Sequence, residues 1–201
     1  MSEASPILIE LPEQLDGSRV RLRPYNAGDA PALWEAVDES REHLAPWLPW
    51  AGRYASVDDA REYVARAAAW WLLRQDLPVG IFERESGRLL GGSGLHRIDW
   101  DLRSFEIGYW LRRSAEGRGY MTEAVQLLTR WAFDDLAASR VFIRMDVRNA
   151  RSRAVAAGLG FVHEGTLRNS LPDTEGRPRD SHMYALIPED YRGLAWVSGG
   201  E

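Results

Sequence analysis

The middle of the chain joins an apolar run to a long helical pattern through two glycines, and this junction restricts the fold more than any other feature. Residues 103–111 are rich in apolar and aromatic side chains and predict a strand, whereas apolar positions in residues 117–136 recur at helical spacing. Gly117 and Gly119 allow the backbone to turn sharply between the two elements and to approach a ligand closely. Because the first N–H groups of a helix have no intrahelical acceptor, the junction predicts an anion-binding turn.

Three arginines near this turn strengthen the prediction of an anion site. Arg112, Arg113 and Arg118 flank the glycines in sequence, and a pyrophosphate fits a turn that offers free N–H groups and positive charge. Taken alone, the Gly-x-Gly spacing is more typical of ordinary turn geometry. It lacks the third glycine of a dinucleotide-binding fingerprint and the Gly-Lys-Ser/Thr end of a Walker loop, so neither of those sites is indicated.

The remaining patterns place this junction in a sheet covered by helices. Strands are expected at residues 20–23, 79–84, 89–98, 103–111, 140–147, 161–168 and 179–186, and helices after Asp29, after Ser56, at 117–136 and at 150–157. Short connections make the three strands between residues 79 and 111 an antiparallel meander. The order predicts an α/β (α+β) fold with a mixed, mostly antiparallel central sheet of about seven strands, flanked by about four helices. The 201 residues suit a single domain, with a core at about residues 19–191 and short tails.

Composition excludes several classes of site and partner. The chain has no cysteine, which excludes a disulfide framework, a thiol nucleophile and a cysteine-ligated metal, and its four histidines lack metal-binding spacing. No metal is therefore expected. The formal net charge of -5 argues against a nucleic-acid partner. Because neither a signal-peptide pattern nor an apolar run long enough to cross a bilayer is visible, we expect no membrane partner and a cytoplasmic location.

Two adjoining segments carry a family resemblance. Residues 105–111 (Phe-Glu-Ile-Gly-Tyr-Trp-Leu) and then 117–124 (Gly-Arg-Gly-Tyr-Met-Thr-Glu-Ala) closely resemble the acyl-CoA-binding motif of the GNAT acetyltransferases. The resemblance is strongest to the branch that contains the RimJ and RimL ribosomal-protein N-acetyltransferases. Further matches follow the family's order at residues 94–98, 147–155, 158–165 and 183–186, and the likeness covers roughly residues 19–191. It implies the GNAT fold and an N-acetyltransferase with acetyl-CoA as cosubstrate.

The resemblance assigns the donor site to the turn, the strand before it and a later helix. In this family the amides of the turn bind the pyrophosphate and the strand pairs with the pantetheine. These roles would fall on Trp110, Leu111, Glu116, Gly117, Arg118, Gly119, Tyr120, Met121 and Thr122. Asn149 would contact the pantetheine, and Ser152 would lie near the thioester sulfur, where a hydroxyl can protonate the leaving thiolate. The residues alone favour a simpler interpretation, with Asn149 as a helix N-cap and Ser152 as an exposed helical serine.

The general base does not transfer from the family. In RimL-like enzymes a glutamate a little beyond the late Glu-Gly pair has this role, and the corresponding position here is Leu171. Glu106, in the strand before the glycine turn, is the substitute that we expect to be catalytic. The alternative is a solvated or ion-paired strand residue, with Arg103 as the partner. Further candidates for the base are His96, Asp173 and His182.

An aromatic stretch before the second helix is expected to wall the acceptor site. By resemblance Trp47 and Trp50 bind the acceptor, and His96 and Glu106 complete the predicted substrate site. The alternative is that these tryptophans are core residues or the contacts of a homodimer. Residues 168–179 are polar and contain turn-forming residues, which indicates either a mobile loop that gates the acceptor or an ordinary hairpin loop.

Together these assignments indicate transfer of an acetyl group from acetyl-CoA to a primary amine, with a protein N-terminal α-amine as one acceptor. Without a cysteine to carry the acyl group, direct transfer in a ternary complex is expected. One alternative keeps the fold but uses a small-molecule amine or succinyl-CoA. Another is a CoA-binding regulatory domain without catalysis, because the family's glutamate is replaced by Leu171.

Overall fold

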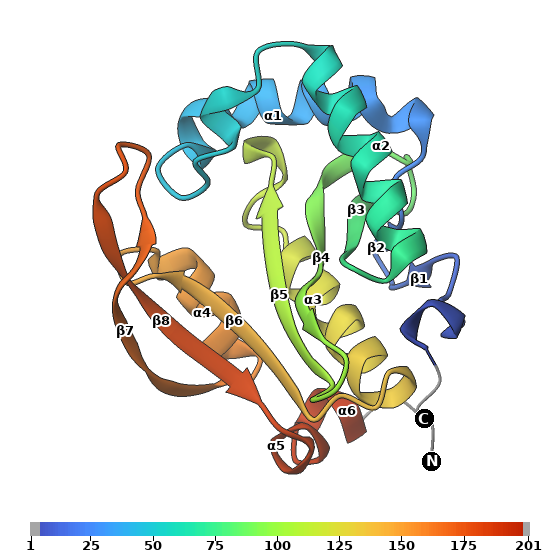
Figure 1. Cartoon of the computed structure of the whole chain (residues 1–201), viewed down its shortest axis with the longest axis vertical. Coiled ribbons are helices and arrows are strands. Elements are labelled where there is room, and N and C mark those ends of the chain that lie inside the picture. The colour runs from blue at the N-terminus through green and yellow to red at the C-terminus, as the bar shows by residue number, and fades with distance from the viewer. Residues whose placement is uncertain (1–4, 199–201) are drawn as a thin grey trace.

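One eight-stranded sheet organises the chain (Figure 1). The computed structural model describes residues 5–198, so residues 1–4 and 199–201 of the predicted tails lie outside it. The strands, in their order across the sheet, are β1 (Leu15–Asp16), β2 (Val20–Arg23), β3 (Leu77–Glu83), β4 (Leu89–Asp99), β5 (Ser104–Leu111), β6 (Arg140–Asp146), β8 (Pro178–Leu186) and β7 (Val162–Pro172). Among the strands of the described chain, only β5 and β6 pair in parallel. The predicted mixed, mostly antiparallel sheet and its central meander are confirmed.

Helices cover the sheet in two groups. They are α1 (Ala30–Leu44), α2 (Val57–Leu73), α3 (Tyr120–Arg130), α4 (Ala150–Gly158), α5 (Pro188–Arg192) and α6 (Ala195–Ser198). In Figure 1, α1 and α2 lie together over one end of β3, β4 and β5, whereas α3 and α4 lie behind the sheet. A π-helical turn, Trp131–Asp135, continues α3 toward β6. None of the described helices is long and apolar enough to cross a membrane.

Two hydrophobic cores result, one on each face of the central strands. On β5 the alternation of side chains buries Phe105 and Ile107 against α3, in the larger core that also contains Leu128. The smaller core joins α1 and α2 to the other face, where Leu33 packs near Phe82. Alternation therefore directs Glu106 and its neighbours at even positions of β5 toward α1 and α2.

The structure has more elements than the sequence predicted. The additional strand is β1, whose two residues pair with β2 through the backbone and are too few to show alternation. The two additional helices, α5 and α6, are short and end the described chain. Helix α1 extends to Leu44, and Ser40 and Leu44 near its end are buried.

The segment at residues 168–179 is mostly strand, which contradicts the prediction of a mobile gating loop. Strand β7 continues to Pro172 and β8 begins at Pro178. The turn between them is closed by the N–H of Asp173, which donates to the carbonyl of Arg177 at 2.8 Å. Its composition of proline, glycine and charged residues indicated a loop, but cross-strand pairing extends the hairpin through it.

Strands β5 and β6 diverge after a short parallel contact. They pair only where Ser104–Glu106 lies beside 140–142, and Figure 1 shows them opening away from each other toward α1 and α4. Within residues 5–198, no strand therefore pairs with residues 107–111 of β5 on the β6 side. An extended ligand can add to such an edge as a strand would.

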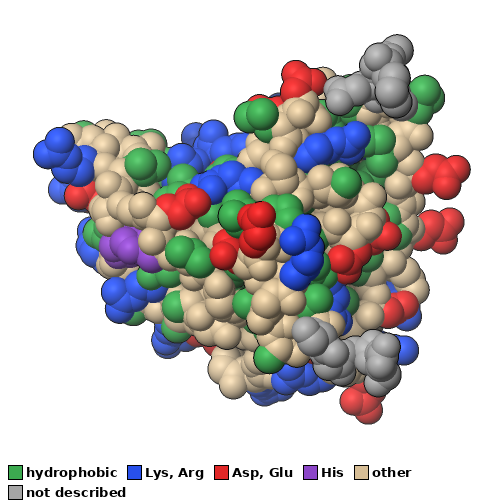
Figure 2. All heavy atoms as spheres, turned by 90° about the horizontal axis from the view of Figure 1, so that it is seen from below, with side chains coloured by type: hydrophobic (Ala, Val, Ile, Leu, Met, Phe, Trp, Pro, Cys, Tyr) green, Lys and Arg blue, Asp and Glu red, His purple; other side chains and the backbone are tan. Residues whose placement is uncertain are grey.

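Charges on the end of the molecule that carries α5 and α6 are mixed. Figure 2 shows arginine and acidic side chains interspersed over this face, without one large basic patch.

Candidate active site

The glycine turn opens helix α3 in the conformation that its sequence suggested. Gly117 and Gly119 have φ values of +72° and +77°, which L side chains rarely adopt. Gly119 is the N-cap of α3, and the first bond of the helix runs from Glu123 N to Gly119 O at 3.2 Å. The N–H groups that precede this bond have no intrahelical acceptor, and they are the groups expected from the sequence to bind an anion.

Two residues that the sequence did not single out hold this turn. The Arg19 guanidinium donates from Nη1 to the carbonyl of Arg118 at 2.7 Å and from Nε to Glu123 Oε2 at 3.0 Å. Glu123, in the first turn of α3, also accepts from the N–H of Arg19 at 3.0 Å. The carbonyl of Arg118 is thus bound on the β2 side of the turn. No local sequence pattern predicts this contact, since Arg19 and Glu123 are 104 positions apart.

Of the three arginines near the turn, Arg112 is unavailable to a ligand. Its side chain is 2% exposed and donates to Glu39 Oε2 at 2.9 Å and to Glu35 Oε1 at 2.7 Å, both on α1. Hydrogen bonds from Arg112 lower the pKa of Glu39 to about 2. The prediction that three arginines surround the anion is therefore wrong for Arg112, because α1 supplies its partners. Arg113 and Arg118 are exposed and remain available.

Side chains of the turn also connect it to α1 and α4. The Glu116 carboxylate pairs with His43 Nε2 at 2.6 Å and with Arg151 Nη1 at 2.7 Å. Tyr120 and Met121 are each 8% exposed, so their side chains belong to the core and only their backbone can serve a ligand. Thr122 is half-buried.

A tyrosine joins β5 to the start of α4 across the opening beside β6. Tyr109 Oη lies 3.1 Å from the carbonyl oxygen of Ser152 and 3.0 Å from its Oγ. Asn149 Oδ1 accepts from the N–H of Ser152 at 3.1 Å, which confirms Asn149 as the N-cap of α4. Burial raises the pKa of Tyr109 to about 12, so its phenol stays protonated at neutral pH. The sequence named Ser152 and Asn149 but gave no signal for Tyr109.

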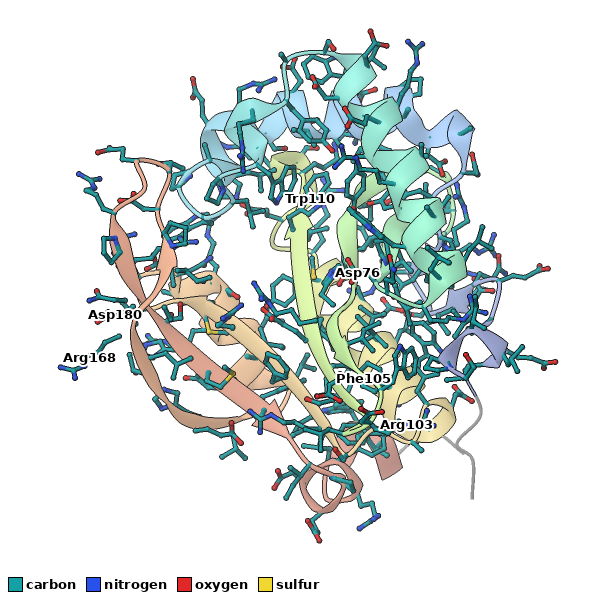
Figure 3. All side chains as sticks on the ribbon, viewed as in Figure 1. Asp76, Arg103, Phe105, Trp110, Arg168 and Asp180 are labelled. Carbon is teal, nitrogen blue, oxygen red and sulfur yellow. The ribbon has the colours of Figure 1, made fainter. Side chains whose placement is uncertain are left out.

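An aromatic pocket of ≈ 380 Å³ lies between β4, β5, α1 and α2. Its lining is Leu33, Leu48, Trp50, Tyr54, Tyr63, Trp70, Asp76, Gly92, Ser93, His96, Gly108, Tyr109 and Trp110. The rings of Trp50 and Trp110 meet edge to face with centroids 5.7 Å apart. In Figure 3, Trp110 lies at the end of β5 beneath α1 and α2, and Asp76 lies beside β4. Trp47 is not among the lining residues, although the sequence paired it with Trp50.

The polar groups of this pocket include a histidine bound to a carboxylate. His96 Nδ1 lies 2.8 Å from Asp76 Oδ1, and the two side chains are 28% and 27% exposed. A carboxylate has only acceptors, so Nδ1 carries the hydrogen and Nε2 of the neutral ring is the acceptor. The pocket therefore combines an apolar wall with the imidazole of His96, which Asp76 orients.

Glu106 lies opposite His96 in the β4–β5 register but does not line the pocket. Its side chain is 12% exposed and pairs with Arg97 Nε at 2.9 Å and Arg144 Nη2 at 3.4 Å. Burial raises the pKa of Glu106, and the guanidinium groups of Arg144 and Arg97 oppose that rise. Ion pairing was one expected alternative for this residue, but its partners are these two arginines rather than Arg103.

The other two candidates for the base lie elsewhere. Asp173 accepts from the N–H and the Nε of Arg177 at 2.8 and 2.9 Å and holds the β7–β8 turn. His182 on β8 lies 2.9 Å from Thr166 Oγ1. Neither lines the aromatic pocket, and neither does Leu171, which pairs with Arg179 in the β7–β8 hairpin.

Comparison with known families decides the identity of this arrangement. Residues 19–162 match the family described as acetyltransferase (GNAT) domain. The chain is a GNAT acetyltransferase. It belongs to the RimJ/RimL-like branch, as the resemblance of its glycine turn implied.

Several relatives of this GNAT acetyltransferase are named for ribosomal proteins. It is 34% identical over 179 residues to a Bacillus subtilis (strain 168) protein named "Putative ribosomal N-acetyltransferase YdaF", with 87% of this chain and 94% of that protein covered. It is 28% identical to a ribosomal-protein-serine acetyltransferase of Escherichia coli (strain K12), covering 77% and 85% of the two chains. The solved structure of RimL, a ribosomal L7/L12 α-N-protein acetyltransferase in complex with coenzyme A, has a TM-score of 0.80 and 26% identity over 87% of this chain and 98% of that chain.

Proposed function

We propose that this acetyltransferase moves the acetyl group of acetyl-CoA directly onto a primary amine in a ternary complex, with a protein N-terminal α-amine as the acceptor. The observation that carries the proposal is the position of β5 between two open regions. One edge of β5 beyond Glu106 is unpaired, and the aromatic pocket adjoins Gly108 and Trp110 of the same strand. A donor along the edge and an acceptor in the pocket would meet at this strand.

The donor half of the proposal rests on the turn and on the edge of β5. The pyrophosphate would take the free amides of the turn, while the pantetheine would pair with the β5 backbone and reach Asn149 and Ser152. The donor residues are then Trp110, Leu111, Glu116, Gly117, Arg118, Gly119, Tyr120, Met121, Thr122, Asn149 and Ser152. Free N–H groups at the positive end of a helix dipole suit a pyrophosphate. The related RimL structure contains coenzyme A.

Departure of the thiolate can be assisted at the start of α4. The hydroxyl of Ser152 lies 3.0 Å from that of Tyr109, so each can orient the other toward the sulfur. A hydroxyl that donates to the developing thiolate stabilises it, and such proton transfer contributes typically about 10²–10⁴-fold to a rate. Ser152 would act on the sulfur, and Tyr109 would position it.

The chemistry of amines favours an N-terminal acceptor over a lysine side chain. An α-amine has a pKa of about 7.7–8.0, against about 10.4 for lysine, and each unit corresponds to 1.36 kcal/mol. Reaching the same neutral fraction from lysine would therefore require roughly 3.5 kcal/mol more. A site whose predicted carboxylate base, Glu106, is shared by two arginines suits the acceptor that needs less help.

The aromatic pocket also favours a second acceptor class, a small-molecule amine with a flat or apolar body. Trp50, Tyr54, Tyr63, Trp70 and Trp110 supply most of its wall. Aromatic walls bind flat groups through offset or edge contacts. The same surface can hold the first side chain of a peptide, so the two acceptor classes differ in what lies beyond the amine.

Direct product analysis tests the proposed function. The protein is incubated with acetyl-CoA and a peptide that begins with a free serine, and both thiol release and peptide mass are followed. We expect one acetyl group per thiol, on the α-amine. A matched peptide with a blocked α-amine and one lysine should not react. Acetylation of lysine alone, or no transfer to any peptide or aromatic amine, would refute the proposal, and succinyl-CoA in place of acetyl-CoA identifies the acyl group.

A further inference from the structure

We propose that His96, oriented by Asp76, is the group that takes the proton from the acceptor amine. The inference rests on the proposed function, because it concerns the acceptor pocket of that site. Of the predicted bases, only His96 lines the pocket. Its Nδ1 is occupied by Asp76 at 2.8 Å, which leaves Nε2 as the acceptor.

Two glycines make room for the imidazole against the sheet. Gly94 and Gly108 face each other in the β4–β5 register. A Cβ on Gly108 would lie 3.0 Å from His96 Cδ2 and 3.4 Å from Nε2, and a Cβ on Gly94 would lie 3.0 Å from Cε1. Side chains at either position would crowd the ring. The two glycines thus leave room for the His96 ring against the sheet, with Nε2 beside Gly108 at the pocket.

Asp76 fixes the tautomer that this role requires. Since the carboxylate can only accept, the hydrogen of the neutral ring stays on Nδ1. An imidazole that turned over would present an N–H to the amine and could not accept its proton. Asp76 also stabilises the imidazolium that forms, as an orienting carboxylate does beside a catalytic histidine.

Two carboxylates and two phenols surround His96. Asp76 faces it from just before β3, Glu106 faces it from β5, and Tyr63 and Tyr109 lie on the pocket wall. Burial raises the pKa of both tyrosines, so they remain neutral phenols. The guanidinium groups of Arg97 and Arg144 are paired with Glu106.

Glu106 is less suited to receive the proton than His96. Its carboxylate is shared by those two arginines and is not part of the pocket lining. Although burial raises the pKa of Glu106, its carboxylate is held by the two arginines outside the pocket and is not placed to meet an amine bound there. In this arrangement Glu106 positions the strand and contributes negative charge near His96.

The step balances in atoms and charge. The amine enters as an ammonium ion and gives one proton to His96 Nε2. Its lone pair then forms a C–N bond to the thioester carbonyl carbon, and the C–S bond breaks. The second proton passes from nitrogen to the thiolate, directly or through Ser152. Amide and free thiol leave, and the imidazolium returns its proton to water.

The decisive variant is His96→Gln, with His163→Gln as its matched control on the exposed strand β7. We expect His96→Gln to lower kcat by about 10²–10⁴-fold and to move the fall in rate at acidic pH to the pKa of the acceptor amine itself, about 7.7–8.0 for an α-amine, while CoA affinity stays unchanged. His163→Gln should behave as the parent protein, and Glu106→Gln should lower kcat less than His96→Gln does. If His96→Gln keeps both the parent rate and its acidic limb, the proposal is wrong.

A spectroscopic measurement tests the dyad without turnover. Proton–nitrogen correlation of the four imidazoles in the unliganded protein should show His96 with its hydrogen on Nδ1, assigned by the loss of its signals in His96→Gln. Asp76→Asn should change this tautomer and lower kcat while the KM for acetyl-CoA is preserved. A hydrogen on Nε2 in the parent protein would overturn the inference. An active parent enzyme with a full-rate His96→Gln rejects only the role of His96, whereas absence of transfer by the parent rejects the proposed function itself.

Discussion

Glu123 binds the polypeptide before β2 to the start of α3 through four hydrogen bonds. Its two oxygens accept from the N–H and hydroxyl of Ser18 and from the N–H and Nε of Arg19. A Cβ on Gly17 would lie 2.4 Å from Glu123 Oε1, so glycine is needed for this approach. Burial alone would raise the pKa of Glu123, but the hydrogen bonds lower it below its usual value.

Glu123→Gln should therefore destabilise the protein at neutral pH. An amide cannot accept all four bonds as a carboxylate does, and we expect a loss of about 1–3 kcal/mol in the free energy of unfolding. Because the folded pKa is depressed, this stabilisation is present above the unfolded pKa of about 4.3 and is lost as pH falls through the lower folded value. The free energies of unfolding of Glu123→Gln and of the parent protein should thus converge at acidic pH.

Urea unfolding at neutral and acidic pH measures this difference. Glu85→Gln is the matched control, because Glu85 is exposed in the turn between β3 and β4, and it should change stability little at either pH. A constant gap between Glu123→Gln and the parent across the acidic range would show that the carboxylate charge does not stabilise the fold.

At this scale the sequence identified types of residue but not their partners. It named His96 and Ser152, yet Asp76 is 20 positions from His96 and Tyr109 is 43 positions from Ser152. Periodicity reports which face of an element a residue occupies, and it carries no information on contacts between elements. The error at Arg112 has the same origin, since its acidic partners come from α1.

At the scale of elements, the junction of β5 and α3 was the most predictable part of the chain. Its glycines, its apolar alternation and its helical spacing agree with one another, and local agreement of this kind specifies a structure strongly. Strand β1 and the extended β7–β8 hairpin were not predictable, because backbone pairing rather than side-chain pattern defines them. The single-domain boundaries and the homodimer remain predictions.

Alanine substitutions in the turn should separate backbone strain from ligand binding. Gly117→Ala and Gly119→Ala place a side chain in a left-handed conformation, which costs about 1–2 kcal/mol, and they also crowd the proposed pyrophosphate. Gly87→Ala is the matched control, with φ of +70° and no atom within 4 Å of its added Cβ. All three should melt at lower temperature. Only the two turn variants should weaken CoA binding. Their Kd should rise about tenfold for each 1.4 kcal/mol of binding free energy that is lost.

Calorimetric titration with coenzyme A, together with thermal melts, measures both effects. Equal CoA affinity in Gly117→Ala, Gly119→Ala and Gly87→Ala would place the pyrophosphate outside this turn. A further check comes from Arg19, whose Nη1 lies 2.9 Å from the position of a Cβ on Gly119, so Gly119→Ala should destabilise more than Gly117→Ala.

At the scale of the whole molecule, Arg179 connects β8 and β6 to the segment after α1, across the opening between β5 and β6. From β8 its Nη2 donates to the carbonyl of Trp47 at 3.0 Å, in the segment after α1, and its Nη1 donates to Asp146 of β6 at 3.2 Å. Its side chain is 11% exposed.

Arg179→Met should loosen the acceptor side without affecting the donor side. Loss of these hydrogen bonds frees the segment that leads to Trp50. We therefore expect the acceptor KM to rise several-fold, which corresponds to the roughly 0.5–1.5 kcal/mol that one hydrogen bond contributes. CoA affinity should stay constant. Steady-state kinetics with the acceptor varied measure it. Arg177→Met is the control, because Arg177 is 67% exposed and pairs within its own turn. A selective change in CoA affinity would show that Arg179 serves the donor instead.

The unpaired edge of β5 has a consequence for the choice of acyl group. In the proposed arrangement the cosubstrate completes the sheet with its pantetheine, a part that acetyl-CoA and every longer acyl-CoA share. Backbone pairing along residues 107–111 therefore retains all of them alike and cannot sort one from another. Discrimination must arise beyond the sulfur, where the acyl chain would approach Gly108 and the ring of His96. In that arrangement, the range of acyl groups that fit would depend on the room left between Gly108 and the ring of His96, and not on the strand edge that pairs with the pantetheine.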